Sequence, residues 1–315
     1  MGAASVAGFG VVRPAGGRGF SQNADRPSWV LGIFVPRLAT GPWPIKLVLR
    51  MQLIDTHCHL YSKEFGRDIE EVIQRAEKEG VTKFYLPAID SKCQEALLTL
   101  EARHPGKCVG TTGLHPCHVK ADWEAELEFV ASELGRRRWV AVGEIGLDFY
   151  WDRTFEKEQY AAFHRQIEWA LRDRIPIVIH SRNSMSESIG VVREYQRGGG
   201  RGGAGGGGAL RGIFHCFSGD AAAAAAIVDL GFYLGIGGVL TYKNSGLAEA
   251  IRDIPLEWMV LETDAPYLAP VPFRGKRNES AYLRYVAAKL AEVKGVTVEE
   301  VARVTTENAQ KIFGN

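Results

Sequence analysis

The sequence predicts an α/β protein that folds as one (β/α)8 barrel, and three observations support this. Eight short apolar segments alternate with amphipathic segments of helical period. Strands that are apolar on both faces and separated by helices form parallel sheets, and eight such units close into a barrel. The length fits, because such a barrel needs about 250 residues and the chain has 315. An open doubly wound sheet is the alternative.

The predicted strands follow one another between residues 52 and 264, each with a Gly or Pro signal near the helix that follows it. They are QLIDTH (52–57), TKFYLPA (82–88), CVGTTGL (108–114), WVAVGEI (139–145), PIVIH (176–180), GIFHCF (212–217), FYLGIG (232–237) and WMVLETD (258–264).

Helical segments follow these strands. DIEEVIQRAEKEG (68–80) comes after the first strand and EKEQYAAFHRQIEWALRD (156–173) after the fourth. A run of six alanines from Ala221 is predicted to be helical, because Ala is the best helix former and Asp220 is a suitable residue for a helix start. The last two segments, 281–295 and 297–314, supply the eighth helix and one more that packs outside the barrel.

Two segments do not fit the barrel pattern. Residues 1–50 are rich in Gly and Pro, have no sustained period and carry a net charge of +5, so we expect a disordered extension. Because Met51 stands where the pattern begins, we interpret this segment as a mis-called start or a dispensable extension rather than a targeting signal. In residues 198–208, nine of eleven positions are Gly, which predicts a flexible loop insertion in the 51–315 barrel.

Composition narrows the class of protein. Hydrophobic content of 46%, charged content of 24% and a net charge of +1 are typical of a soluble globular protein. Five scattered cysteines without a CxxC pair indicate reduced thiols, so we expect a cytoplasmic location. The apolar stretch 29–35 is too short to span a bilayer, and we expect no membrane association.

The first strand carries an acid and two histidines at alternate positions, Asp55, His57 and His59. Side chains at alternate positions of a strand share one face, so the three are expected to point the same way. A pair of histidines at this spacing is weak evidence by itself, because chance alone gives about 0.2 such pairs in a chain with eight histidines.

Four more polar residues stand at or near the carboxyl ends of predicted strands: Glu144, His180, His215 and Asp264. Their separations correspond to whole βα units of about 30 residues. In a barrel all these ends meet at the mouth where active sites lie. The sequence therefore predicts that these residues gather with His57 and His59.

Four histidines and two carboxylates, without a thiolate, suit Zn, Mn or Mg in a hydrolytic role. Six ligands are too many for one catalytic ion with an open position, so we expect two divalent ions. Glu144 lies midway in strand order between the histidine groups and is the natural bridge.

The motifs IDTHCH, GEIGLD, IHSR, HCFSG, ETDAPYL and RGKRNES resemble, in order and spacing, those of the TatD family of metal-dependent deoxyribonucleases. The resemblance covers Met51 to Asn315, and it implies a TIM barrel of the amidohydrolase type with DNA exonuclease activity. It assigns His57, His59 and Asp264 to one ion, His180 and His215 to the other, and Glu144 to both. Ser280, where the family usually has Pro, and the Gly-rich insertion depart from the family pattern.

A bound divalent ion lowers the pKa of water from 15.7 towards about 7, and a pair of ions stabilises both oxygens of an in-line displacement at a phosphodiester. Asp264 is the candidate catalytic proton acceptor, together with Glu144 as the bridging residue. His115, Arg182, Arg274 and Arg277 are candidate contacts to substrate phosphates.

The expected partner is a DNA strand end or a short single strand. Residues after position 50 carry a net charge of −4, which is unsuited to neutralising a long duplex. A local basic patch, with a few of the aromatic residues near strand ends stacking on unpaired bases, suits an exonuclease. RNA or a small phosphodiester is also open as substrate.

Two other functions remain possible from the sequence. One is a binuclear amidohydrolase that acts on a small lactone, ester or amide. Relatives of the phosphotriesterase type bridge their ions with a carboxylated Lys at the fourth strand, where this chain has Glu144. The other is a non-enzymatic barrel in which metal ions only stabilise the mouth.

Overall fold

The computed structural model describes residues 51–196 and 209–314. The predicted disordered extension 1–50 and the predicted loop insertion at 198–208 lie outside the described residues, so both stay predictions. The described residues belong to one compact unit, Leu49–Asn315.

Each of the eight predicted strands has a counterpart, and every strand pairing is parallel. The strands are β1 (Leu53–Asp55), β2 (Val81–Leu86), β3 (Cys108–Gly110), β4 (Val142–Asp148), β5 (Ile177–Arg182), β6 (Gly212–Phe214), β7 (Tyr233–Ile236) and β8 (Met259–Leu261).

The strands close into a barrel through two seams. Continuous pairing gives one run of β1 to β3 and another of β4 to β8. A parallel bridge between Thr112 and Val142 joins the two runs on one side. On the other side the Thr56 N–H donates to the Leu261 carbonyl at 3.0 Å. The predicted (β/α)8 barrel is therefore confirmed, and the open sheet is not formed.

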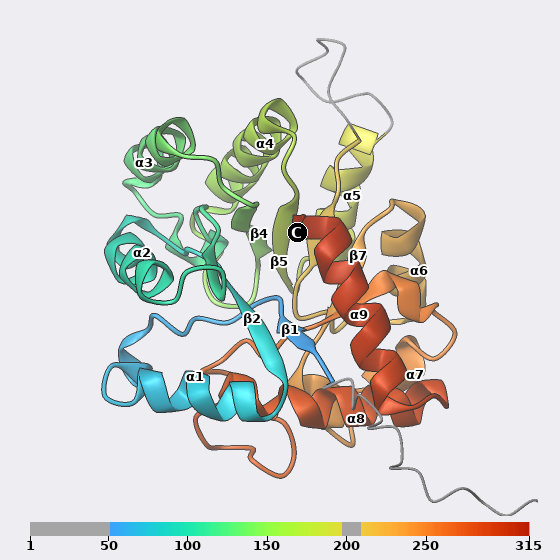
Figure 1. The fold of residues 1–315 in the computed structure, drawn as a ribbon. Coiled ribbons are helices and arrows are strands. Elements are labelled where there is room, and N and C mark those ends of the chain that lie inside the picture. Colours follow the sequence, from blue (N-terminus) through green and yellow to red (C-terminus); the bar gives the residue numbers. More distant parts are fainter. Residues whose placement is uncertain (1–50, 197–208, 315) are drawn as a thin grey trace, which may run out of the picture. The chain divides into compact units, whose positions relative to one another are not determined.

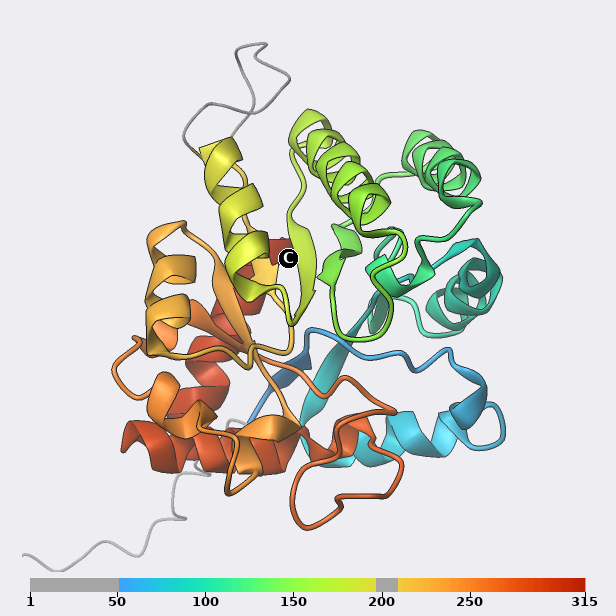
Figure 2. The ribbon, with the colours of Figure 1, turned by 180° about the vertical axis from the view of Figure 1, so that it is seen from behind.

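The helices surround the strands (Figures 1 and 2). They are α1 (Ile69–Lys78), α2 (Gln94–Arg103), α3 (Trp123–Arg136), α4 (Glu156–Asp173), α5 (Met185–Gln196), α6 (Ala221–Asp229), α7 (Leu247–Ala250), α8 (Leu283–Lys294) and α9 (Val298–Phe313). The alanine run forms α6 as predicted, and the Asp220 carboxylate caps it by accepting from the Ala223 N–H at 2.8 Å. Within the described ranges, no helix is both long and apolar enough to traverse a bilayer.

The inside of the barrel is filled at the amino ends of the strands. An apolar cluster, buried except for the partly buried Val109 and Tyr233, takes side chains from every strand or its immediate neighbour and from α9. Its other members are Ile54, Tyr85, Ala141, Val178, Ile213, Val260, Ala309, Ile312 and Phe313. The rings of Tyr85 and Phe313 stack with centroids 3.9 Å apart. The Asn308 amide donates to the carbonyls of Leu256 and Met259, which fixes α9 under β8. The apolar cluster occupies the amino ends of the strands, so polar side chains can gather at the carboxyl ends.

Candidate metal centre

The six predicted ligands come together at the carboxyl ends of the strands. Glu144 lies in β4 and His180 in β5, while His215 directly follows β6. His57 and His59 follow the last residue of β1, and Asp264 follows β8. The close approaches among them therefore join five separate regions of the chain.

Glu144 stands at the centre of this group, and its carboxylate is almost completely buried. Its Oε2 lies 3.1 Å from His57 Nε2 and 3.7 Å from His59 Nε2. Its Oε1 lies 2.9 Å from His180 Nδ1 and 3.7 Å from His215 Nε2. The two oxygens of one carboxylate thus face different histidines, as a bridging ligand requires.

Asp264 faces three of the same histidines. Its Oδ1 lies 3.5 Å from His59 Nε2 and 3.8 Å from the Nε2 atoms of His57 and His215. Burial alone would raise the pKa of Asp264, but the hydrogen bond from His59 and the charges of the histidines outweigh it and lower the pKa. The same balance holds the pKa of Glu144 well below its usual range. Both carboxylates are therefore ionised at neutral pH.

The tautomer of His59 follows from its neighbours. The Tyr61 hydroxyl donates its single proton to the Pro87 carbonyl at 2.6 Å. Its oxygen must then accept from His59 Nδ1, which lies 2.9 Å away. In neutral His59 the unprotonated nitrogen is Nε2, the atom that faces Glu144 and Asp264. Tyr61 thus presents a lone pair of His59 to the site.

Carboxylates hold two other histidines in the same manner. Nε2 of His180 lies 2.9 Å from Asp148 Oδ2, and Nδ1 of His215 lies 3.0 Å from Glu262 Oε1. Because a carboxylate only accepts, Nε2 of His180 carries a proton, and Nδ1 of this ring faces Glu144. At His215 the approach to Glu262 is an ionic contact, and Nε2 faces Glu144 and Asp264. Carboxylate–histidine pairs of this kind orient metal-binding imidazoles in proteins.

The charge of the group also suits a cation. Burial lowers the pKa of His215, but Glu262 and Glu144 outweigh this effect and raise the pKa to about 10. Burial likewise opposes the charge on His180, yet hydrogen bonds to Asp148 and Glu144 raise its pKa. Surplus negative charge thus draws protons onto imidazoles that are otherwise neutral. A bound divalent cation would neutralise the same negative charge.

The distances between ligand atoms show whether these residues could bind one metal ion. His57 Nε2 and His59 Nε2 lie 3.3 Å apart with Glu144 Oε2 beside them. Ligands about 2.0–2.1 Å from one cation lie about 3.0–3.4 Å from one another in tetrahedral or octahedral geometry. These three side chains form one group able to hold an ion. The residues present therefore fit the divalent metal that the donor set predicts.

His115 differs from the other histidines of the site. It lies near His180 and Glu144, with Nε2 3.1 Å from His180 Nδ1 and 3.4 Å from Glu144 Oε1. However, His115 Nδ1 accepts from the Cys117 N–H at 3.0 Å, and burial lowers the pKa of His115 to about 4. The single proton therefore sits on Nε2. His115 offers a hydrogen-bond donor to the site rather than a lone pair, although its position alone would permit metal binding.

Three residues of the site were not predicted from the sequence: Tyr61, Asp148 and Glu262. All three lie within or beside the motifs HCHLY, GEIGLD and ETD, so proximity to the ligands was the available signal. Sequence pattern does not show which nitrogen of a histidine a neighbour will hold. That choice depends on contacts between different strands.

The expected position of Asp55 was wrong. The structure ends β1 at this residue, and the alternation that puts Ile54 in the interior cluster turns Asp55 to the other face. Its carboxylate accepts from the backbone N–H and the hydroxyl of Thr263 at 3.0 and 2.6 Å. Burial raises the pKa of Asp55 to about 7 in spite of these bonds. Asp55 thus joins β1 to the segment after β8 and belongs to none of the groups that could hold metal.

The three arginines predicted to contact phosphate have different surroundings. Arg182 lies over the rings of Tyr150 and Trp151, and Arg274 lies over the ring of Tyr242. Arg277 makes a bidentate pair with Asp68 at 2.7 and 2.6 Å. Because its guanidinium is already engaged by a carboxylate, the structure does not favour Arg277 as a phosphate contact.

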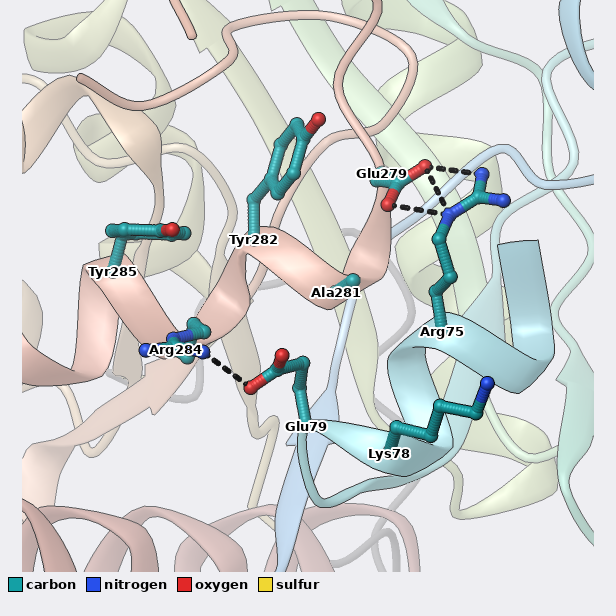
Figure 3. A pocket seen from close by; sticks show the side chains of 8 residues that line it. All are labelled: Arg75, Lys78, Glu79, Glu279, Ala281, Tyr282, Arg284 and Tyr285. Atoms are coloured by element: carbon teal, nitrogen blue, oxygen red, sulfur yellow. Dashed lines mark hydrogen bonds and ion pairs between the residues drawn. The ribbon is translucent and has the colours of Figure 1, made fainter. Parts of the chain in front are cut away.

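A separate pocket of about 450 Å³ lies between α1 and the start of α8, lined by none of the site residues (Figure 3). Its Arg75 pairs with Glu279 at 2.6 Å, and its Arg284 pairs with Glu79 at 2.7 Å. Figure 3 shows both pairs spanning the two elements. The carboxylates of the pocket are thus neutralised within it, which indicates a role in joining α1 to α8.

Comparison with known proteins identifies the family. The sequence profile described as TatD related DNase matches residues 54–314. The chain belongs to the TatD family. The metal-dependent hydrolase YabD of Bacillus subtilis is 36% identical over 262 residues, which cover 83% of this chain and 98% of that protein. This TatD family protein is therefore a metal-dependent hydrolase.

Other relatives of this TatD family chain agree in fold. A protein of Pantoea ananatis described as a 3'-5' ssDNA/RNA exonuclease TatD is 30% identical over 83% of this chain and 99% of its own length. The crystal structure of the TatD homolog YjjV from Escherichia coli superposes with a TM-score of 0.77 at 30% identity, covering 85% of this chain and all of that one. A phosphotriesterase homology protein of E. coli, at 16% identity and a TM-score of 0.57, shares the fold alone.

Replacing Asp148 with Asn tests the orientation of His180. Asn keeps an oxygen that can accept the backbone N–H groups of Tyr150 and Trp151, but its amide offers a donor where His180 needs an acceptor. We expect metal affinity to fall by about 10- to 100-fold, measured by titration of metal-stripped protein. Asp152→Asn is the matched control, because Asp152 lies in the loop directly after Asp148 and pairs with Lys120 instead. Equal affinities of the two variants would contradict this role of Asp148.

Proposed function

We propose that this TatD family hydrolase cleaves phosphodiester bonds at the ends of DNA strands with the help of two divalent ions. The observation that carries the proposal is the Glu144 carboxylate, whose two oxygens face different histidines at the barrel mouth. His57, His59 and Asp264 would hold one ion and His180 and His215 the other. The name of the Pantoea ananatis relative supports an exonuclease activity.

Divalent ions bound there supply an acidified water and a positive field for the phosphodiester oxygens. Asp264 is ionised and partly buried at the mouth, so it accepts the proton of the attacking water. The His115 Nε2–H points into the site and donates to a non-bridging phosphate oxygen. Arg182 has no ion pair with a carboxylate among the described residues, so its charge is available for the next phosphate.

A substrate panel tests the proposal. Metal-stripped protein is given Mg, Mn or Zn and assayed on single-stranded DNA, duplex DNA with free ends, closed circular DNA, RNA, a generic phosphodiester and a lactone. We expect hydrolysis of linear single strands, slower hydrolysis of duplex ends, and none of closed circles. Activity should fall as salt rises, because phosphate contacts release counterions.

The panel also separates the alternatives. Hydrolysis of the lactone with no cleavage of any phosphodiester would replace the nuclease proposal with a small-ester amidohydrolase. Equal rates on closed circular and linear DNA would overturn the recognition of strand ends.

A further inference from the structure

Six large apolar side chains are exposed among the described residues, and five of them lie at the barrel mouth. The six are Tyr150, Trp151, Tyr267, Leu268, Val271 and Val296. All except Val296 lie in two loops, one after β4 and one after β8. Glu144 lies in β4, and Asp264 follows β8. Exposed apolar groups concentrated beside a site are typical of a surface that binds a ligand.

The loop after β4 presents a particular arrangement of rings and charge. Trp151 is 67% exposed and Tyr150 52% exposed. The Arg182 guanidinium carbon lies 3.8 Å from the centre of the Tyr150 ring and 5.1 Å from that of Trp151. The two rings meet edge to face with centroids 4.9 Å apart. Two open aromatic faces and a cation without a carboxylate partner in the described part of the chain therefore stand together.

Asp148 fixes this arrangement relative to the metal centre. Its Oδ1 accepts from the backbone N–H groups of Tyr150 and Trp151 at 2.9 and 3.2 Å. Its Oδ2 lies 2.9 Å from His180 Nε2. One buried carboxylate thus holds both a candidate metal ligand and the backbone that carries the rings. A base on these rings would lie beside the phosphate held at the centre.

We propose that Tyr150, Trp151 and Arg182 form a stacking site for an unpaired base next to the cleaved phosphate, with Arg182 also contacting the backbone of the strand. This inference rests on the proposed function and names the part of the substrate that the site selects. A base in a duplex has both faces covered by its neighbours, so only a single strand or a frayed end presents a face to the rings. Stacking on aromatic side chains tolerates all bases, which suits an enzyme without sequence preference.

Tyr150 and Trp151 are better candidates for stacking than Tyr267, which lies in the loop after β8. Tyr267 is also exposed, and its ring lies edge to face with His59 at 6.1 Å. It has no guanidinium or ammonium group over its ring among the described residues. The exposed rings of the loop after β4, in contrast, have the guanidinium of Arg182, the last residue of β5, beside them.

Binding to metal-stripped protein tests the stacking site without catalysis. Fluorescence anisotropy measures the affinity for a short single-stranded DNA and for an abasic strand of equal length and charge. We expect the wild type to prefer the base-containing strand, and Trp151→Ala to weaken its binding by about 5- to 150-fold with little effect on the abasic strand. Trp151→Phe should restore most of the preference. Tyr285→Ala is the control, because this partly buried ring lies on α8 in the separate pocket (Figure 3).

A second arm uses metal-loaded protein. Trp151→Ala should lower kcat/KM for the base-containing strand and leave kcat/KM for the abasic strand unchanged. Equal affinity of the wild type for the two strands, or an unchanged preference in Trp151→Ala, would overturn the stacking site. Failure of the loaded wild type to cleave either strand would instead overturn the proposed function, while the binding arm still decides whether bases stack on Trp151.

Discussion

Replacing Glu144 with Gln is expected to reduce phosphodiester hydrolysis by about a thousandfold or more and to remove at least one of the two bound ions. A neutral amide offers one acceptor oxygen in place of two, so it cannot bridge the histidines on both sides. Loss of a partner outside the ligand shell already costs about 10- to 100-fold. Loss of a ligand that both ions share should reduce metal affinity and activity by a larger factor. The measurements are kcat/KM on a single-stranded substrate and metal content per chain after dialysis.

The control for this variant is Glu133→Gln. Glu133 is also a buried glutamate, but it lies on α3 and pairs with Arg136 away from the mouth. It should keep both its metal content and its activity. A Glu144→Gln protein that retains two ions and more than a tenth of the wild-type rate would contradict the bridging role. Circular dichroism of both variants shows whether the fold survives.

Removal of metal is expected to abolish hydrolysis and to lower the melting temperature, and resupply of a divalent ion should restore both. The mouth buries Glu144 and several histidines against one another, so without a cation this charge is balanced only by protons. A ligand at 100 times its Kd stabilises the folded state by about 2.7 kcal/mol. Thermal unfolding and activity are measured side by side with chelator and with added Mg, Mn or Zn.

The two readouts separate an enzyme from a metal-stabilised barrel. If the ions only stabilised the mouth, chelation would lower the melting temperature of a protein that hydrolysed nothing in the first place. The Glu144→Gln protein serves as the control, because its melting temperature should respond less to added metal than that of the wild type. An enzyme whose rate is the same with and without chelator would contradict the metal centre.

Much of the fold could be read from local pattern. The predicted fourth helix, 156–173, coincides with α4, because its apolar period and its flanks both mark a helix. The strands were placed correctly, but their ends at the mouth were not: six were predicted too long, whereas β4 and β5 extend beyond their predicted ends at residues 145 and 180. The first was predicted to reach His57 and ends at Asp55, because its continuation bonds across to β8 and the segment after it.

The candidate site shows a similar division. Placing polar residues at strand ends sufficed to predict that His57, His180 and Asp264 converge, since parallel strands of a barrel share one mouth. The pattern did not reveal that Asp148 holds the proton of His180 while the Cys117 backbone holds the lone pair of His115. These two contacts give neighbouring histidines opposite roles.

The sequence by itself determined the order of strands and helices and the residue types delivered to the mouth, because periodicity and strand-end position are local properties of the chain. Only the tertiary structure decided which nitrogen of each histidine faces the centre, that Arg277 is engaged by Asp68, and that Arg182 stands free over two rings. The reason is physical. Proton positions and ion pairs depend on donors and acceptors that lie far apart in the chain and meet only when the barrel closes.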